Sequence, residues 1–253
     1  MSSYAVVTGA SSGIGLEFAK LLARDGYDLL LAARGEKALQ QVARELAQEF
    51  DVSVDYVALD LSNPGSADTL WKKTAGRSVN VLINNAGFGD YAAVIDANWQ
   101  TLEPMIDLNI KALTRLSQLA ATKMVKQGNG HILNLASMAA FFPGANMATY
   151  YATKAYVLSF SEALSVELKK SGVTVTALCP GPTATHFQKT AHAENISIFR
   201  GTLPSAESVA SYGYKAMQRG KVVAVPGLRN KLQASIVLPR SWKRNLVNII
   251  QNR

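Results

Sequence analysis

Residues 4–24 read YAVVTGASSGIGLEFAKLLAR, and this stretch decides the fold. It begins with a short apolar run, passes through Gly9, Gly13 and Gly15, and continues from Leu16 to Arg24 with the apolar spacing of a helix. A strand, a glycine-rich turn and a helix N-terminus in this order favour anion binding, because backbone N–H groups and the helix dipole point at the turn. The glycine spacing is GxxxGxG rather than GxGxxG, so we predict a turn that is one residue longer before the helix.

Six further runs rich in apolar and β-branched residues follow, with helical patterns between most of them. They lie near residues 28–33, 54–58, 79–83, 130–135, 173–178 and 221–225. Strands that alternate with helices predict a parallel sheet covered on both faces. At 253 residues, 48% hydrophobic, and with no linker, the chain can bury one large core. We therefore predict an α/β fold: a single Rossmann-type, doubly wound domain over residues 1–253 with a seven-stranded parallel sheet.

The sequence gives no indication of export, membrane insertion or metal binding. The first residues lack a charged region followed by an apolar one, and no apolar run reaches the ~18 residues of a membrane span. Cys179 is the only cysteine, which forbids an intramolecular disulfide and suits a reducing compartment. His131, His186 and His192 have no partner at metal-ligand spacing. We expect a cytoplasmic protein without a metal site.

The residues at the end of the second predicted strand bear on the choice of nucleotide. In dinucleotide-binding folds an acidic residue about 20 residues after the glycine turn binds the ribose 2′-hydroxyl, whereas a nearby arginine suits a 2′-phosphate. Here Ala33 ends the run, Arg34 follows, and Lys37 is close behind. A surface arginine on a loop would give the same pattern. Because the acid is missing, we predict NADP(H) rather than NAD(H).

A second stretch, YYATK at residues 150–154, opens an apolar helical pattern thirteen positions after Ser137. Tyr150 and Lys154 are four residues apart and therefore neighbours on one helix face. Such a pair also occurs by chance on packed helices. An ammonium within ~4 Å can lower a tyrosine pKa from ~10 by about three units, so we predict that Lys154 lowers the pKa of Tyr150. Tyr151 lies about 100° around the helix with no lysine four positions on, and is predicted to be a bystander.

Together these motifs resemble the classical short-chain dehydrogenase/reductase family over nearly the whole chain. The matching residues are TGASSGIG at 8–15, Asp60-Leu61, Asn84-Asn85-Ala86-Gly87, Asn109, Ser137, YYATK and Pro180-Gly181-Pro182-Thr183. The resemblance implies that Asp60 holds the adenine amine, that residues 84–87 shape the turn under the cofactor, and that residues 180–183 pack on the nicotinamide. The implied cofactor-binding residues are Gly9, Ser11, Ser12, Gly13, Ile14, Gly15, Arg34, Asp60, Leu61, Asn85, Ala86, Gly87, Tyr150, Lys154, Pro180, Gly181 and Thr183.

The resemblance also implies a catalytic tetrad of Asn109, Ser137, Tyr150 and Lys154. Tyr150 would protonate the carbonyl oxygen when hydride reaches the carbon, and would act as a base in reverse. Ser137 would donate to the same oxygen, and Lys154 would hold the nicotinamide ribose. Asn109 would bind a water through a local break in its helix. The implied activity is hydride transfer between NADP(H) and a carbonyl or secondary alcohol; the alternative is a non-catalytic NADP(H)-binding sensor or scaffold.

Two apolar stretches resemble the variable substrate wall and lid of this family. They are residues 138–143 and the lid segment 183–204, which carries Phe187, Ile196, Ile198 and Phe199. An apolar pocket fits a hydrophobic ketone, aldehyde or acyl chain better than a free sugar. Family membership further implies a homodimer or homotetramer built through the long helices around 101–126 and 150–170.

Charge is distributed unevenly along the chain. Residues 1–207 hold 17 basic and 18 acidic side chains, whereas residues 208–253 hold nine basic and no acidic ones. The segment 228–253 reads as a cationic helix broken near Pro239, and could pack on the sheet with its charges in water. It could also contact an anionic membrane surface, bind a phosphate-bearing substrate such as an acyl thioester, or dock on an acidic subunit. No groove-reading module accompanies it, so nucleic acid is not predicted as a partner.

Overall fold

The structure, a computed structural model, describes residues 3–193 and 201–236. Within these ranges it has a seven-stranded parallel sheet with the order β3-β2-β1-β4-β5-β6-β7. The strands are β1 (Tyr4–Thr8), β2 (Asp28–Ala33), β3 (Val54–Ala58), β4 (Val79–Asn84), β5 (Gly130–Leu135), β6 (Val173–Leu178) and β7 (Val223–Ala224). Every pairing between neighbouring strands is parallel, which confirms the predicted doubly wound sheet.

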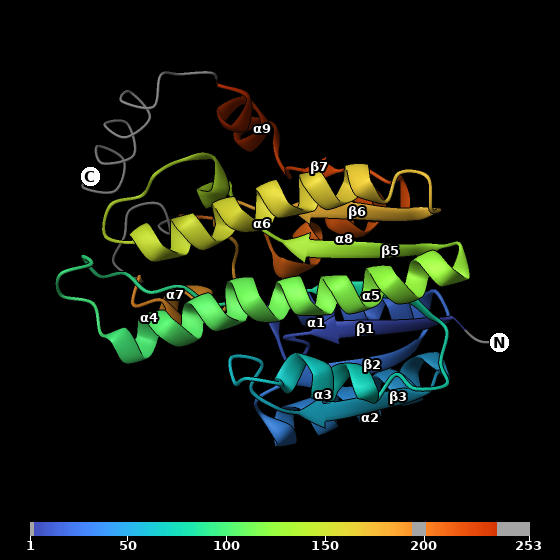
Figure 1. Cartoon of the computed structure of the whole chain (residues 1–253). Helices are drawn as coiled ribbons and strands as arrows, with labels where there is room; N and C mark the ends of the chain where they lie inside the picture. The colour runs from blue at the N-terminus through green and yellow to red at the C-terminus, as the bar shows by residue number, and fades with distance from the viewer. Residues whose placement is uncertain (1–2, 194–200, 237–253) are drawn as a thin grey trace.

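Helices cover both faces of this sheet. One face carries α1 (Gly13–Arg24), α2 (Glu36–Phe50) and α8 (Ala206–Gln218). The other carries α3 (Ser66–Lys72), α5 (Leu113–Gln127) and α6 (Ala148–Glu167). Figure 1 shows α5 and α6 crossing the front of the sheet, with α1 and α8 behind it.

The apolar runs of the sequence follow from burial on both faces. Successive side chains of a strand point to opposite faces. On β1, Ala5 and Val7 belong to the core with Phe18 of α1, whereas Tyr4 and Val6 belong to the core that α5 and α6 cover. A strand buried on both sides is apolar at most positions, which explains why residues 4–7 of β1 and 29–33 of β2 read as unbroken apolar runs rather than as alternating ones.

Three element boundaries differ from those predicted. The first helix begins at Gly13, three residues before Leu16, so two glycines of the motif lie in its first turn. The last strand pairs only at Val223 and Ala224, because the chain turns at Gly220 and Pro226 has no N–H for the ladder. The helix predicted around 101–126 is divided into α4 (Trp99–Ile106), a π-helical turn (Asp107–Ala112) and α5.

The parallel topology brings the loops that follow several strands to one edge of the sheet. The turns after β1, β4, β5 and β6 meet there, beside the start of α6 and the helix α9 (Leu228–Ser235). In the described ranges, the structure contains no helix with the length and apolar character needed to cross a bilayer.

Candidate functional site

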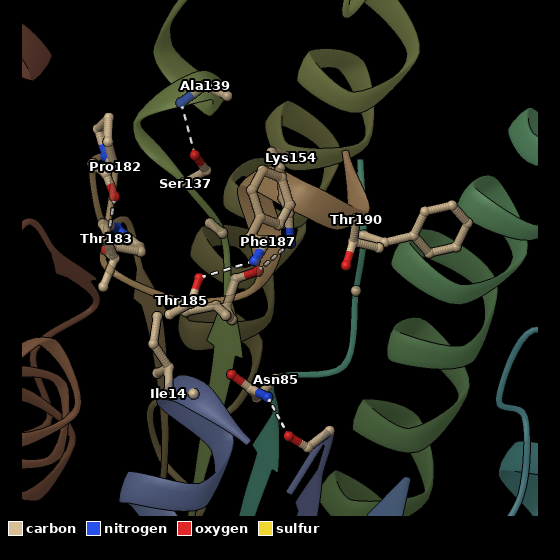
Figure 2. Close-up of a pocket in the computed structure, with 18 of the residues that line it drawn as sticks. Ile14, Asn85, Ser137, Ala139, Lys154, Pro182, Thr183, Thr185, Phe187 and Thr190 are labelled. Atoms are coloured by element: carbon tan, nitrogen blue, oxygen red, sulfur yellow. Dashed lines mark hydrogen bonds between the residues drawn. The ribbon is translucent and has the colours of Figure 1, made fainter. Parts of the chain in front are cut away.

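A cavity of about 1120 Å³ opens at the carboxyl edge of the sheet. All the predicted cofactor-binding residues except Gly15 line it, and so does Ser137. Figure 2 shows Ile14, Asn85, Ser137, Lys154 and Thr183 arranged around this space. Pockets for one small ligand measure ~300–1,000 Å³, so the cavity can hold a dinucleotide together with a second molecule.

The glycine turn leaves the N-terminus of α1 open to an anion. Gly9 has φ of 65°, and a Cβ there would lie 2.6 Å from Asn85 Nδ2. A Cβ on Gly15 would collide with the Gly9 carbonyl oxygen, so the close approach of turn and helix requires glycine. Ser12 caps α1 without a side-chain hydrogen bond, and the first turn carries no acidic residue. Nothing on the first turn competes with a phosphate for its N–H groups, so this cradle fits a dinucleotide pyrophosphate.

The Asn-Asn-Ala-Gly turn after β4 is hydrogen-bonded directly to the glycine turn. Asn85 Nδ2 donates to the carbonyl oxygens of Thr8 (3.0 Å) and Gly9 (3.2 Å). The Thr8 hydroxyl in turn accepts from the backbone N–H groups of Asn85 and Ala86, each at 3.0 Å. These bonds hold the two turns at a fixed separation beneath the cavity.

Two predicted cofactor residues mark another part of the cavity wall. Asp60 Oδ1 accepts hydrogen bonds from the Ser62 backbone N–H (2.9 Å) and hydroxyl (2.7 Å), which fixes the carboxylate. Arg34 follows the end of β2, lines the cavity and is exposed. It forms no salt bridge with the residues that the structure describes. Its guanidinium can therefore bind an anion in the cavity.

Ser137, Tyr150 and Lys154 come together at the wall formed by β5 and α6. Burial raises the pKa of Tyr150 far above its usual value, although a hydrogen bond from Ser137 lowers it in part. The Lys154 Nζ lies 5.8 Å from the Tyr150 ring centroid and donates to the Leu135 carbonyl at 2.7 Å. The predicted net lowering of the Tyr150 pKa is therefore not found in this structure, because desolvation of the phenol outweighs the hydrogen bond from Ser137. The contribution of the Lys154 ammonium stays a prediction.

Burial also lowers the pKa of Lys154, to about 8. Below that pH the ammonium is charged in the folded and unfolded states, and folding carries the full cost of burying it. As pH rises from about 8 to 10.5 the folded protein loses this proton first, so the cost disappears over that range. We therefore expect Lys154→Met to raise the free energy of unfolding at pH 7 by about 2 kcal/mol, allowing for the lost bond to Leu135.

Urea titrations of the cofactor-free protein at pH 7 and pH 10 would measure this effect. The wild type should gain stability between the two pH values, and Lys154→Met should lose most of its advantage at the higher one. If Lys154→Met were more stable than the wild type by the same amount at pH 7 and pH 10, the methionine would act through packing alone.

Asn109 lies outside the cavity lining and is fully buried in the π-helical turn. Its side chain accepts from the Phe88 N–H (3.2 Å) and donates to the Phe88 carbonyl (2.9 Å) and to the Thr153 hydroxyl (3.1 Å). Thr153 donates in turn to the Tyr150 carbonyl at 2.7 Å. The predicted local break is present as a π-helical turn, and the side chain connects the loop after β4 to α6. The proton relay through Asn109 stays a prediction.

Thr153, which the sequence analysis did not single out, completes this connection. Thr153→Val keeps the shape of the side chain but leaves a buried amide N–H of Asn109 without its partner. We expect the free energy of unfolding to fall by about 1–2 kcal/mol. Thr153→Ser retains the hydroxyl, so the free energy of unfolding should fall less in the same denaturant titration. An equal fall in the two variants would show that the methyl group, and not the hydroxyl, stabilises the fold.

The lid side of the cavity is aromatic. Phe187 of α7 (Phe187–Thr190) has its ring centroid 5.3 Å from that of Tyr150. Tyr151 meets Tyr150 edge-on at 6.2 Å and lines the cavity, so it belongs to the wall beside Tyr150. That it takes no part in the chemistry stays a prediction. The lid is joined to the loop after β4 by the bond from the Tyr91 N–H to the Ala191 carbonyl (2.9 Å). The predicted lid residues Ile196, Ile198 and Phe199 lie outside the described residues.

One wall of the cavity was not predicted. Asn230 and Gln233 of α9 line it. Substrate binding was one of several alternatives for the basic segment 228–253, but no residue of that segment was predicted to line the site. The Asn230 amide packs against Gly181, where an added Cβ would lie only 2.9 Å from Asn230 Nδ2. The same Nδ2 donates to the Pro226 carbonyl at 2.8 Å. This contact depends on where the chain returns after β7, and no local pattern indicates it.

Comparison with known proteins gives consistent results. The short chain dehydrogenase family model matches residues 3–196. An uncharacterised oxidoreductase of Staphylococcus aureus strain N315 is 39% identical over 180 residues, which cover 70% of this chain and 76% of that protein. A short-chain dehydrogenase of Sphingobium yanoikuyae, solved in complex with NADPH, is 31% identical with a TM-score of 0.84, covering 94% of this chain and 97% of that one.

A third relative is the bulky-bulky ketone specific alcohol dehydrogenase of Comamonas testosteroni. It is 27% identical with a TM-score of 0.79, over 98% of this chain and 92% of that one. The family model covers well over half of the sequence and includes the glycine turn, the turn after β4 and the YYATK helix. The chain therefore belongs to the short-chain dehydrogenase family of oxidoreductases.

Proposed function

We propose that the protein is an NADP(H)-dependent enzyme that reduces a hydrophobic ketone, aldehyde or acyl compound and oxidises the corresponding alcohol in reverse. The observation that carries this proposal is the grouping of Ser137, Tyr150 and Lys154 on one wall of a cavity whose other end is the glycine turn. A proton donor and an anion cradle in one cavity are what hydride transfer to a carbonyl requires.

The residues proposed to hold NADP(H) divide by the part of the cofactor they suit. The first turn of α1 suits the pyrophosphate, Asp60 the adenine, and Arg34 a 2′-phosphate. Pro180, Gly181 and Thr183 stand beside Ser137: the Pro180 carbonyl accepts from the Met138 N–H at 2.8 Å, which fixes that loop near the reacting end. The NADPH in the Sphingobium relative supports this choice of cofactor.

Bound NADPH would supply the hydride. In the direction of reduction, Tyr150 donates its hydroxyl proton to the substrate oxygen while a C–H bond forms at the carbonyl carbon. Because burial raises its pKa, Tyr150 is protonated at neutral pH, which is the form that reduction needs. Ser137 donates a second hydrogen bond to the same oxygen, and the Lys154 ammonium favours the tyrosinate that remains. Solvent then returns the proton to Tyr150.

The proposed substrate class follows from the wall of the cavity. The cavity is lined by Met138, Phe142, Met147, Tyr151 and Phe187, and the last three of these pack with Tyr150 in one apolar cluster. A site of this kind favours an apolar carbonyl compound over a sugar, whose hydroxyl groups would lose hydrogen bonds to water. The ketone named for the Comamonas relative supports the same class.

Three broader features belong to the same proposal. The chain is proposed to be one domain over residues 1–253, and among the described residues both apolar cores share the strands of the sheet. The protein works in the cytoplasm, where the buried thiol of Cys179 stays reduced. It assembles as a homodimer or homotetramer through α5 and α6, which carry the exposed apolar side chains Val125 and Val166.

The test is the loss of NADPH absorbance with a panel of hydrophobic ketones, aldehydes and acyl thioesters, with NADH in parallel. Turnover that requires NADPH would support the reductase and indicate its substrate class. Tight NADPH binding without turnover on any member would favour the sensor or scaffold alternative. Tighter binding of NADH than of NADPH would contradict the cofactor assignment.

A further inference from the structure

Helix α9 and the residue after it present an apolar stripe to solvent, formed by Leu228, Leu232 and Ile236. These residues are 75%, 62% and 40% exposed. Leu228 and Leu232 are four apart and lie on one side of the helix, and Ile236 follows its last turn. The opposite side packs on the protein, with Ala234 in the cluster around Met138 and Asn230 against Gly181. Leu232 therefore points away from the fold, whereas Leu228 and Ile236 also border the cavity. Burial within the described part of the chain does not explain why these exposed positions are apolar.

Positive charge flanks this stripe. At ~100° per residue, Arg229 and Lys231 fall on its two sides. Neither forms a salt bridge with a described residue, although the Lys231 Nζ lies 5.5 Å from the centroid of the Tyr212 ring. From residue 208 to the end the sequence has nine basic and no acidic side chains. Apolar residues bordered by lysine and arginine fit the boundary between headgroups and acyl chains of an anionic bilayer, where the cations reach lipid phosphates.

The stripe also borders the mouth of the cavity. Leu228, Arg229, Gln233 and Ile236 line that cavity, so the surface next to the stripe leads directly to the proposed substrate site. A hydrophobic carbonyl compound partitions into a bilayer, and an enzyme seated there could take its substrate from the lipid phase. This last step depends on the proposed function, whereas the docking does not.

We propose that the α9 stripe, with Arg229 and Lys231, docks the protein on an anionic lipid surface with the cavity mouth toward it. A second copy of the chain is a poorer occupant, because a symmetric contact would place two acid-free basic segments against each other. Nucleic acid also fits the α9 stripe less well than a lipid surface, because a phosphate backbone would bind the cations but leave the leucines in water.

The experiment is flotation of the full chain with vesicles of phosphatidylcholine alone or mixed with phosphatidylglycerol, at low and high salt. The chain should float only with the anionic vesicles and should be released by salt. Leu232 and Lys231 are the residues to change, because neither lines the cavity. Leu232→Ser should weaken the partitioning roughly tenfold, and Lys231→Glu about fivefold or more.

Matched controls are Ile95→Ser in the loop after β4, which is 93% exposed, and Lys72→Glu on α3, which is exposed as well; both should float like the wild type. The proposal is overturned if the wild type does not float with anionic vesicles, or if the control variants lose as much binding as the α9 variants. It is also overturned if Leu232→Ser instead lowers the mass in sedimentation velocity, because a second copy would then cover the stripe. Flotation needs no turnover, so a failure of the proposed reductase activity would be seen separately.

Discussion

Tyr150→Phe is expected to lower kcat for carbonyl reduction by about 1,000-fold or more, with NADPH affinity nearly unchanged. General acid catalysis typically contributes ~10²–10⁴ in rate, and Tyr150 is the titratable hydroxyl that lines the cavity beside both Ser137 and Lys154. Phenylalanine keeps the ring and its contact with Phe187, so the wall of the site should persist. Steady-state rates together with the quenching of protein fluorescence by NADPH would separate the two effects.

Tyr151→Phe is the matched control, because Tyr151 lies in the same cavity wall but one position around the helix. It should change KM for an apolar substrate by a few fold and leave kcat within about tenfold, since it removes a wall hydroxyl and not the proton donor. A loss in Tyr151→Phe as large as in Tyr150→Phe would assign the chemistry to the wrong tyrosine. Activity that survives in Tyr150→Phe would reject Tyr150 as the general acid.

The sheet could be predicted closely because its two buried faces favour apolar residues at most strand positions. Residues 29–33 form an unbroken apolar run, because their strand pairs with a neighbour on each side and is covered on both faces. The helix start at Gly13 could not be placed, because glycine has low helix propensity and only the approach of Gly15 to Gly9 makes that turn compact.

Part of the site was predictable and part was not, for physical reasons. Tyr150 and Lys154 share a helix face by spacing alone, so their meeting follows from the sequence. Their pKa values do not, because desolvation depends on the whole fold around them. Asn230 and Thr153 were missed since their partners, Gly181 and Asn109, are distant in the chain. Long-range contacts of this kind leave no periodic pattern to read.

Arg34→Asp is expected to change the ratio of kcat/KM with NADPH to that with NADH by about 100- to 1,000-fold, in favour of NADH. The arginine lines the cavity at the end of β2 without a salt bridge to a described residue. Removing a charge-assisted bond to a 2′-phosphate costs ~1.5–3 kcal/mol, and the new carboxylate would repel that phosphate while accepting from the 2′-hydroxyl of NADH.

Lys37→Asp is the matched control, because Lys37 is a nearby exposed cation that does not line the cavity. If long-range electrostatic attraction sets the preference for NADPH, both variants should shift the ratio of the two kcat/KM values. The shift should then shrink at high salt, where the Debye length falls below ~10 Å. If direct binding sets it, Arg34→Asp alone should reverse the preference and should do so at high salt too. A wild type that already prefers NADH, or an Arg34→Asp ratio equal to the wild type's, would remove Arg34 from the cofactor site and leave its place beside the cavity unexplained.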